Sequence, residues 1–304
     1  MSVHGQLVPE GSRLIALSKR MQSLLQWNHF RRMPALIRMA AVTIVMLCLV
    51  AVLAPLLAPY GSGDQDLLVR LQPPVFLGGA WSHPLGTDHL GRDVLSRLLF
   101  ALRTTLIIAS LGVIVGVVTG GLAGLASGLA GRRIDNMFML LVDAQASVPL
   151  TLLALAAVAL TGSSPLVLIL IVGISEYDKY ARVVRSQVLV IKSRTFVESA
   201  RALGASPLRV AFRHVLPGLV SPLTVLATIN FSSVVILESA LSFLGVGIQP
   251  PNTSLGAMLG EARNYLISNW CLAAIPTAFI VMITMAVSLL GDWLRDLFDR
   301  RLSS

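Results

Sequence analysis

Five long apolar segments constrain the fold of this 304-residue chain more than any other feature. Each is about 20 residues long or longer, the length that an α-helix needs to cross about 30 Å of hydrocarbon. They comprise residues 39–59, 104–131, 137–160, 218–237 and 271–290. Because 55% of all residues are apolar and only 13% are charged, a soluble globular protein is excluded. We therefore expect an all-α integral membrane protein.

A sixth apolar segment, residues 165–175, is only about half as long as a membrane-crossing helix. Charged residues interrupt it, but they are spaced so that they can pair on one helix. Glu176 and Lys179 are three residues apart, and Asp178 and Arg182 are four apart. The sequence is therefore compatible with a helix that continues through these charges.

The positions of the basic residues indicate whether this sixth segment crosses the membrane, because Lys and Arg are retained on the cytoplasmic side. With six crossings and a cytoplasmic N-terminus, 19 of the 24 basic residues lie in the cytoplasm. Without the sixth crossing, only 9 of them do. The sequence thus predicts six transmembrane helices with both termini in the cytoplasm.

These spans divide the chain into consecutive parts. Apolar residues between Leu14 and Leu25 recur at helical spacing beside basic residues, which is typical of a helix on the cytoplasmic membrane surface. No small-residue cleavage site follows an early apolar run, so we expect the first span to remain as an anchor. The expected parts are a cytoplasmic segment at 1–38, a first transmembrane helix at 39–59, an extracytoplasmic loop at 60–103, a five-helix core at 104–292 and a cytoplasmic tail at 293–304.

Glycine occupies every fourth position along much of the second apolar segment. The residues are Gly112, Gly116, Gly120, Gly124 and Gly128. Positions four apart share one face of a helix, and glycine lets another helix approach closely where lipid provides no hydrophobic drive for association. The pattern predicts tight helix packing, with direct contact to a substrate as the alternative.

Two acidic residues, Asp143 and Glu238, are expected within the membrane. An ionisable group there is a candidate for contact with a transported substrate or ion. Near a helix end, the same group can instead hydrogen-bond a neighbour or face water. Both residues are therefore candidates for a substrate pathway.

Motifs for catalysis and for metal or nucleotide binding are missing from the sequence. The five histidines show no His-x-x-x-His spacing, and no Gly-x-Ser-x-Gly turn is present. None of the three lysines follows a glycine, which excludes the phosphate-binding loop Gly-x-x-x-x-Gly-Lys-Ser/Thr. We predict no catalytic residue, no metal ligand and no cofactor for this chain.

The most informative cytoplasmic segment is 193–219, SRTFVESARALGASPLRVAFRHVLPGL. A first helix is expected at 195–203, with Gly204 as its left-handed cap. Ser206 and Pro207 are suited to begin a second helix. Leu216-Pro217 is then expected to break the chain before the next span. The segment is predicted to form a basic two-helix element at the cytoplasmic face of the membrane.

Three interpretations apply to this element. A solvated loop that follows the orientation rule explains its charge but not its turn residues. A DNA-binding helix-turn-helix has a similar form, but confinement between two spans hinders access to a groove, so we expect no nucleic-acid partner. A docking site for a cytoplasmic protein explains both the charge and the turns.

The segment also resembles the EAA loop of ABC-importer permeases, whose pattern is Glu-Ala-Ala, three residues, Gly, nine residues, Ile, one residue and Leu-Pro. The matching positions here are Glu198, Ser199, Ala200, Arg201, Gly204, His214, Leu216 and Pro217. Ser199 and His214 depart from the general pattern, although His before Leu-Pro is similar to the dipeptide, oligopeptide and nickel branch. The stretches GTDHLGRDVLSRLL (86–99) and LSFLGVGIQPP (241–251), with GAMLGEAR and LLGDWLRDLFD after them, fit the same branch.

This resemblance implies the C-type subunit of a peptide-class importer with the type I permease fold, in the bacterial inner membrane. It implies a homologous B-type permease as the second half of a heterodimer. Two cytoplasmic ABC ATPase subunits would bind ATP and Mg, and an extracytoplasmic binding protein would deliver the substrate. The region around 181–217 would be the ATPase-coupling loop, with its first short helix seated on an ATPase subunit.

The identity of the substrate stays open at this point. Di- and oligopeptides, nickel or other metal chelates, opines and glutathione are all carried by similar permeases. A stand-alone secondary transporter is a less favoured alternative, because we find neither an internal repeat nor a convincing set of ion-coupling acids. An intramembrane enzyme is disfavoured by the missing catalytic motifs.

Overall fold

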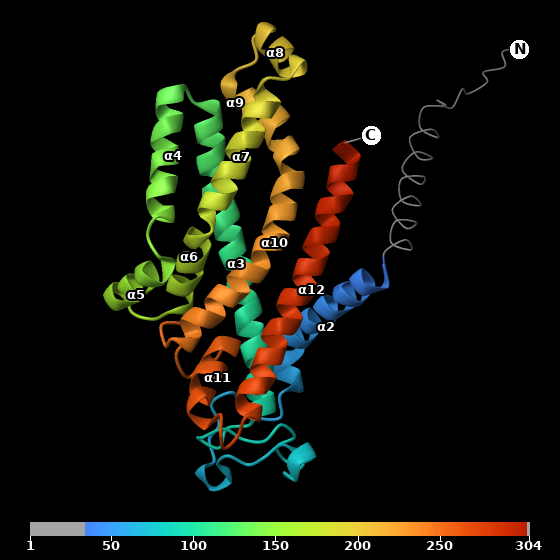
Figure 1. Ribbon diagram of the computed structural model, residues 1–304, viewed down its shortest axis with the longest axis vertical. Coiled ribbons are helices and arrows are strands. Elements are labelled where there is room, and N and C mark those ends of the chain that lie inside the picture. The colour runs from blue at the N-terminus through green and yellow to red at the C-terminus, as the bar shows by residue number, and fades with distance from the viewer. Residues whose placement is uncertain (1–33, 303–304) are drawn as a thin grey trace, which may run out of the picture. The chain divides into compact units, whose positions relative to one another are not determined.

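The computed structural model describes residues 34–302, except for the side chains of Leu150, Arg201, Pro207 and residues 298–302. Within this part the chain is helical and contains no β-strand (Figure 1). The surface helix predicted between Leu14 and Leu25 lies outside the described residues. From Ala40 onward the chain forms one compact unit.

Among residues 34–302, four helices are long and apolar enough to cross a membrane. They are α2 (Ala35–Leu57), α3 (Val94–Leu129), α10 (Leu216–Phe243) and α12 (Cys271–Leu302). A fifth span results if α4 (Arg132–Ala146) and α5 (Leu150–Thr161), which meet at an angle of 87°, are counted together. The remaining apolar helix, α6 (Pro165–Ser175), is shorter and leads directly into α7 (Tyr177–Lys192).

α10 and α12 run past the expected ends at 237 and 290, to Phe243 and Leu302. Two other differences from the expected spans have a local cause. α3 begins at Val94, ten residues before the predicted start, because the carboxylate of Asp93 caps it by accepting the Ser96 N–H at 2.7 Å. The third span is not one straight helix. Pro149 disfavours a helical conformation at the residue before it, and the chain turns between α4 and α5.

The spacing of the charges after α6 predicted that a helix continues through them, and α7 does follow directly after α6. Glu176, with φ −103° and ψ 0°, separates α6 from α7. Lys179 pairs with Glu176, and Arg182 Nη2 lies 3.6 Å from Asp178 Oδ2. The predicted span that begins at residue 165, the fourth along the chain, is therefore a pair of helices with one break.

The predicted two-helix element is present as α8 (Thr195–Ala202) and α9 (Pro207–Val210). Gly204 has the left-handed φ of +84° expected of a cap, and Ser206 Oγ accepts the Arg209 N–H at 3.3 Å. The break expected at Leu216-Pro217 was wrong. A π-helical turn, Ala211–Val215, carries α9 straight into α10, and Leu216 has helical φ and ψ of −56° and −43°. Pro217 is tolerated because it lies in the first turn of α10, where its missing N–H costs little.

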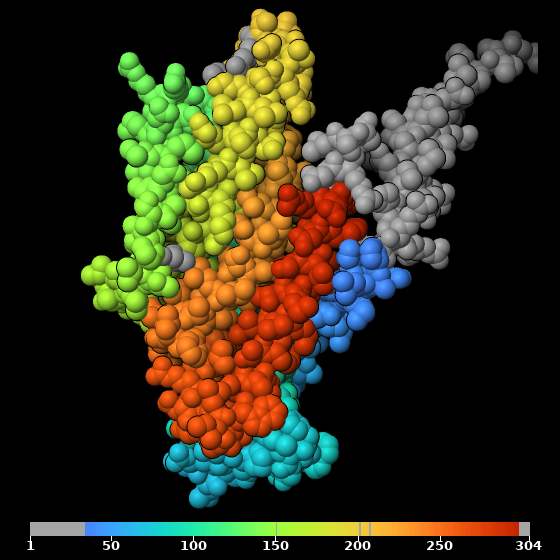
Figure 2. Space-filling model, in the orientation of Figure 1, coloured from blue at the N-terminus to red at the C-terminus, as the bar shows by residue number. Residues whose placement is uncertain are grey.

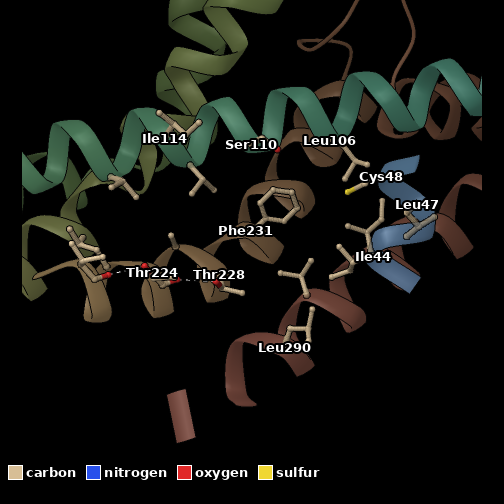
Figure 3. Close-up of a pocket in the computed structure, with 17 residues that line it drawn as sticks. Ile44, Leu47, Cys48, Leu106, Ser110, Ile114, Thr224, Thr228, Phe231 and Leu290 are labelled. Carbon is tan, nitrogen blue, oxygen red and sulfur yellow. Dashed lines mark hydrogen bonds between the residues drawn. The ribbon is translucent and has the colours of Figure 1, made fainter. Parts of the chain in front are cut away.

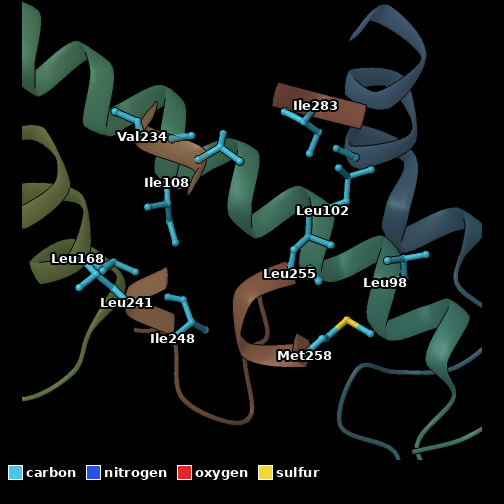
Figure 4. Close-up of a cluster of buried hydrophobic side chains, with 14 of the residues drawn as sticks. Leu98, Leu102, Ile108, Leu168, Val234, Leu241, Ile248, Leu255, Met258 and Ile283 are labelled. Carbon is cyan, nitrogen blue, oxygen red and sulfur yellow. The ribbon is translucent and has the colours of Figure 1, made fainter. Parts of the chain in front are cut away.

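Two apolar clusters hold the bundle together. The larger joins α3, α6, α10, α12 and the short outer helix α11 (Leu255–Ala262). Figure 4 shows part of it, including Leu102, Val234 and Leu255. The smaller cluster joins α7 to the two-helix element and the start of α10, through Val184, Val188, Ile191, Val197, Val210, Val215 and Leu219. The two-helix element is therefore packed onto α7 and α10.

The glycines at 112–128 lie against α6 and α7. A Cβ atom on Gly120 would lie 2.3 Å from the carbonyl oxygen of Tyr177, and one on Gly124 would lie 2.4 Å from that of Ala181. On Gly128 it would lie 2.7 Å from Val188 Cβ. Nearer the start of α3, Gly112 faces Val172 and Gly116 faces Gly173 and Tyr180. At Gly120 and Gly124 backbone meets backbone, so no side chain fits without displacing a helix.

We expect Gly120→Ala to lower the thermal unfolding temperature of the purified protein, because the added methyl overlaps a backbone oxygen that can move only with α7. Such overpacking costs about 1–3 kcal/mol or more. Gly121→Ala is the matched control, since a Cβ there meets nothing within 4 Å. Equal melting temperatures for the two variants would contradict the packing described here.

Candidate functional site

The two-helix element exposes apolar side chains at its surface. Phe196, Leu203, Leu208 and Phe212 are all exposed, and Leu203 is 89% accessible. The element lies where α7 ends and α10 begins, at one tip of the molecule in Figure 2. Apolar side chains grouped on a solvent-facing loop are typical of a surface that binds another protein.

The residues of the EAA-like pattern lie around this surface. Glu198 and Ser199 on α8 are exposed, as is Gly204, whereas Ala200 is half-buried. The side chain of Arg201 lies outside the described part. His214 is half-buried in the π-helical turn, with its ring 5.9 Å from that of Phe196. Leu216 and Pro217 are exposed at the start of α10.

A large apolar groove lies between α2, α3, α10 and α12 (Figure 3). Its volume is about 710 Å³, and no charged residue lines it. The hydroxyls of Thr224 and Thr228 face the groove, but they donate to carbonyl oxygens of their own helix. The groove therefore suits an apolar occupant.

Glu238 is fully buried and is not among the residues that line this groove. Ser242 Oγ donates to its Oε1 at 2.7 Å, and Thr105 Oγ1 donates to its Oε2 at 3.2 Å. Thr105 Oγ1 in turn accepts the N–H of Leu255 at 3.1 Å. The carboxylate thus links α10, α3 and α11 inside the protein, which favours packing over substrate contact.

Asp143 lies in a different environment. Its side chain is 62% exposed on α4, and Oδ1 is 3.3 Å from Arg182 Nη2 on α7. Of the two acids expected within the membrane, only this one faces outward.

A network of ion pairs holds the outer segment between α2 and α3 against α11. Arg92 Nε lies 2.6 Å from Asp88 Oδ2, and Arg92 Nη2 lies 2.6 Å from Glu261 Oε2. Arg97 Nη1 pairs with Asp88 and lies 2.8 Å from Glu261 Oε2. We call Asp88, Arg92, Arg97 and Glu261 the outer clasp.

Sequence reasoning missed the outer clasp. Three of its residues lie in the stretch GTDHLGRDVLSRLL and the fourth in GAMLGEAR. Charges of both signs within the first stretch were a signal of ion pairing. Their partner Glu261, however, is 164 residues from Arg97 and 169 from Arg92. Only the fold brings these two stretches together.

The outer clasp is electrically balanced, with two carboxylates and two guanidiniums. Asp88, His89 and Glu261 are close enough to one another to share a metal ion. Both carboxylates already accept hydrogen bonds from arginines, however, and a cation would have to displace them. The arrangement therefore favours a structural joint over a metal site.

Burial by itself would raise the pKa of Asp88, but the guanidiniums of Arg97 and Arg92 and the N–H groups of Arg92 and Leu90 outweigh it. The pKa of Asp88 consequently lies below its usual value of 3.8. A carboxylate with a lowered pKa stabilises the fold above its unfolded-state pKa. That contribution is lost as the pH drops from about 4 through the folded-state pKa.

We expect Arg97→Gln to destabilise the outer segment by about 3 kcal/mol, because removing one partner of a buried network leaves carboxylates poorly compensated. Limited proteolysis between α2 and α3 measures the effect. Arg70→Gln is the control, since Arg70 is exposed and has no ion pair within the described residues. The same protease resistance in both variants would show that the outer clasp does not stabilise the segment between α2 and α3.

Comparison with known proteins gives consistent matches along the chain. Residues 112–304 match the family model described as "Binding-protein-dependent transport system inner membrane component". Residues 24–74 match the "N-terminal TM domain of oligopeptide transport permease C".

Individual relatives cover most of the chain. The di/tripeptide transport system permease protein DppC of Pseudomonas aeruginosa (strain UCBPP-PA14) is 38% identical over 255 residues, 84% of each protein. The glutathione transport system permease protein GsiD of Pectobacterium atrosepticum is 36% identical over 278 residues, 91% of each. Among solved structures, the MetNI methionine ABC transporter, in inward-facing conformations, matches with a TM-score of 0.52 and 19% identity. The match covers 67% of this chain and 95% of that one.

The structural match shows a shared fold, and the sequence matches show common descent. ATP hydrolysis in such transporters belongs to separate subunits, so this chain is a non-catalytic, multi-pass subunit of the inner membrane. It belongs to the family of inner membrane components of binding-protein-dependent transport systems, the permeases of ABC importers.

Proposed function

We propose that this chain is the C-type permease subunit of an ABC importer for di- and oligopeptides. In this proposal it forms the translocation pathway together with a homologous B-type permease. The observation that carries the proposal is the two-helix element with its exposed apolar surface, in a chain 38% identical to a di/tripeptide permease. The partners are two cytoplasmic ABC ATPase subunits, which bind ATP and Mg, and an extracytoplasmic substrate-binding protein.

Six spans with cytoplasmic termini fit this role. Counting α4/α5 and α6/α7 as two broken spans gives six crossings when added to the four long helices. Figure 1 draws α8, α9 and the C-terminal end of α12 toward the same end of the bundle. The basic residues beyond the middle of α7, which include Lys192, Arg194, Arg209 and Arg213, favour the cytoplasm for that end.

The two-helix element is suited to transmit movement from an ATPase. Its exposed residues Phe196, Leu203 and Leu208 offer a docking surface. Its buried residues Val197 and Val210 pack with α7 and α10. A displacement of α8 would therefore move both helices as one body and alternate the access of a central pathway.

Two other surfaces fit the remaining partners. The groove of about 710 Å³ is apolar and open along membrane helices, which suits a helix of the homologous permease. The segment held by the outer clasp lies at the opposite end from α8 in Figure 1, which suits a binding protein that delivers substrate from outside.

Peptides are the favoured substrate because the two relatives above are named for di/tripeptide and glutathione transport. Glutathione is the second candidate, supported by 36% identity to the glutathione permease. Nickel or metal chelates and opines have no observation of their own in their favour.

We expect Gly204→Leu to leave membrane insertion intact and to reduce substrate uptake and ATPase coupling at least about tenfold. Leucine is disfavoured at the φ of +84° that sets α8 against α9. Gly131→Leu is the matched control, because Gly131 lies between α3 and α4 with φ −74° and open space around it. Measurement uses the complete transporter in proteoliposomes, and normal uptake by Gly204→Leu would rule out the coupling role.

A further inference from the structure

Five charged residues lie together where α4/α5 and α6/α7 break. We call Asp143, Glu176, Asp178, Lys179 and Arg182 the break cluster. Arg182 Nη2 lies 3.3 Å from Asp143 Oδ1 and 3.6 Å from Asp178 Oδ2, and Lys179 pairs with Glu176. Three of these side chains face outward, with exposed fractions of 62% for Asp143, 49% for Arg182 and 45% for Lys179.

The break cluster lies about halfway along the neighbouring span. Val172 on α6 and Val234 on α10 both lie beside Gly112, so they share one level. Val234 is nine residues, about 14 Å, from the outer end of α10, and Glu176 is one helical turn farther inward than Val172. Glu176 is thus about 20 Å from the outer end of a helix about 42 Å long, and Arg182 is six residues, about 9 Å, farther inward.

Charged side chains at this depth of the membrane are unfavourable in contact with lipid. Each charged side chain at the centre of a membrane helix costs about 3 kcal/mol. Two helix breaks at this level also leave backbone groups that need water or protein as hydrogen-bonding partners. The outward face of the cluster therefore meets a water-filled path or a protein partner in the membrane.

We propose that the break cluster lines the translocation pathway and binds the two charged termini of a zwitterionic peptide. This inference rests on the function proposed above and adds a substrate site to it. Asp143 receives the peptide ammonium group, and Lys179 and Arg182 receive its carboxylate. Glu238, being fully buried, takes no part.

The composition of the cluster suits a passing substrate. Its three carboxylates and two cations pair internally when no peptide is present. A peptide with one ammonium and one carboxylate group adds no net charge, so it can exchange partners with these pairs without changing the net charge of the cluster.

Cysteine accessibility in the complete transporter tests whether the cluster faces water. Asp143→Cys and Arg182→Cys are made with Cys48 and Cys271 replaced by alanine, and membranes are treated with an anionic, water-soluble methanethiosulfonate reagent. Val52→Cys on α2, an apolar position that is 71% exposed, is the control. We expect both cluster positions to react at least about tenfold faster than the control. Equal rates would overturn the proposal.

Uptake of alanyl-alanine by proteoliposomes tests substrate contact. Asp143→Asn is expected to lower uptake at least about tenfold, and Asp143→Glu to retain it. Asp292→Asn, the same substitution at an exposed position on α12, is expected to have no effect. Normal uptake by Asp143→Asn would overturn this site and leave the importer assignment intact. An assembled wild-type transporter that takes up no alanyl-alanine would contradict the peptide importer and this site together.

Discussion

Backbone contact between α3 and the α6–α7 pair is the constraint on which the remaining structure depends. Lipid does not drive two apolar helices together, so close packing has to come from small residues that let backbones meet. Gly120 and Gly124 allow this, since a Cβ on either would lie within 2.4 Å of a carbonyl oxygen of the α7 region. This contact holds a pair of short helices, one of them strongly polar, against the long helix α3.

The two-helix element and the break cluster both depend on that contact. The two-helix element packs on α7 and α10 through Val197, Val210 and Val215, so its position follows that of α7. The break cluster lies at the start of α7, beside Gly120. A movement of α8 therefore reaches the level of the charges through α7, on which the element packs, while the π-helical turn passes the movement of α9 directly to α10.

Much of this arrangement could be predicted from local sequence. Helix length, glycine spacing and the cap at Gly204 depend on neighbours within a few residues, and the fold retains them. Two features depend on distant partners. The outer clasp joins Arg97 to Glu261 across 164 residues, and Glu238 is buried because Thr105 and Leu255 enclose it. The continuous path through Pro217 was missed because a π-helical turn has no simple sequence signal.

We expect α8 and α7 to move as one rigid body when the ATPases act. Spin labels at Ser199 and Ser186 report the distance between these helices, and a label on the permease proposed as the partner reports the movement of Ser186 relative to it. We predict an unchanged Ser199–Ser186 distance between the nucleotide-free and ATP-bound transporter, together with a changed distance to the proposed partner permease. A change confined to the Ser199–Ser186 distance would contradict it, because the movement would then be absorbed within the loop.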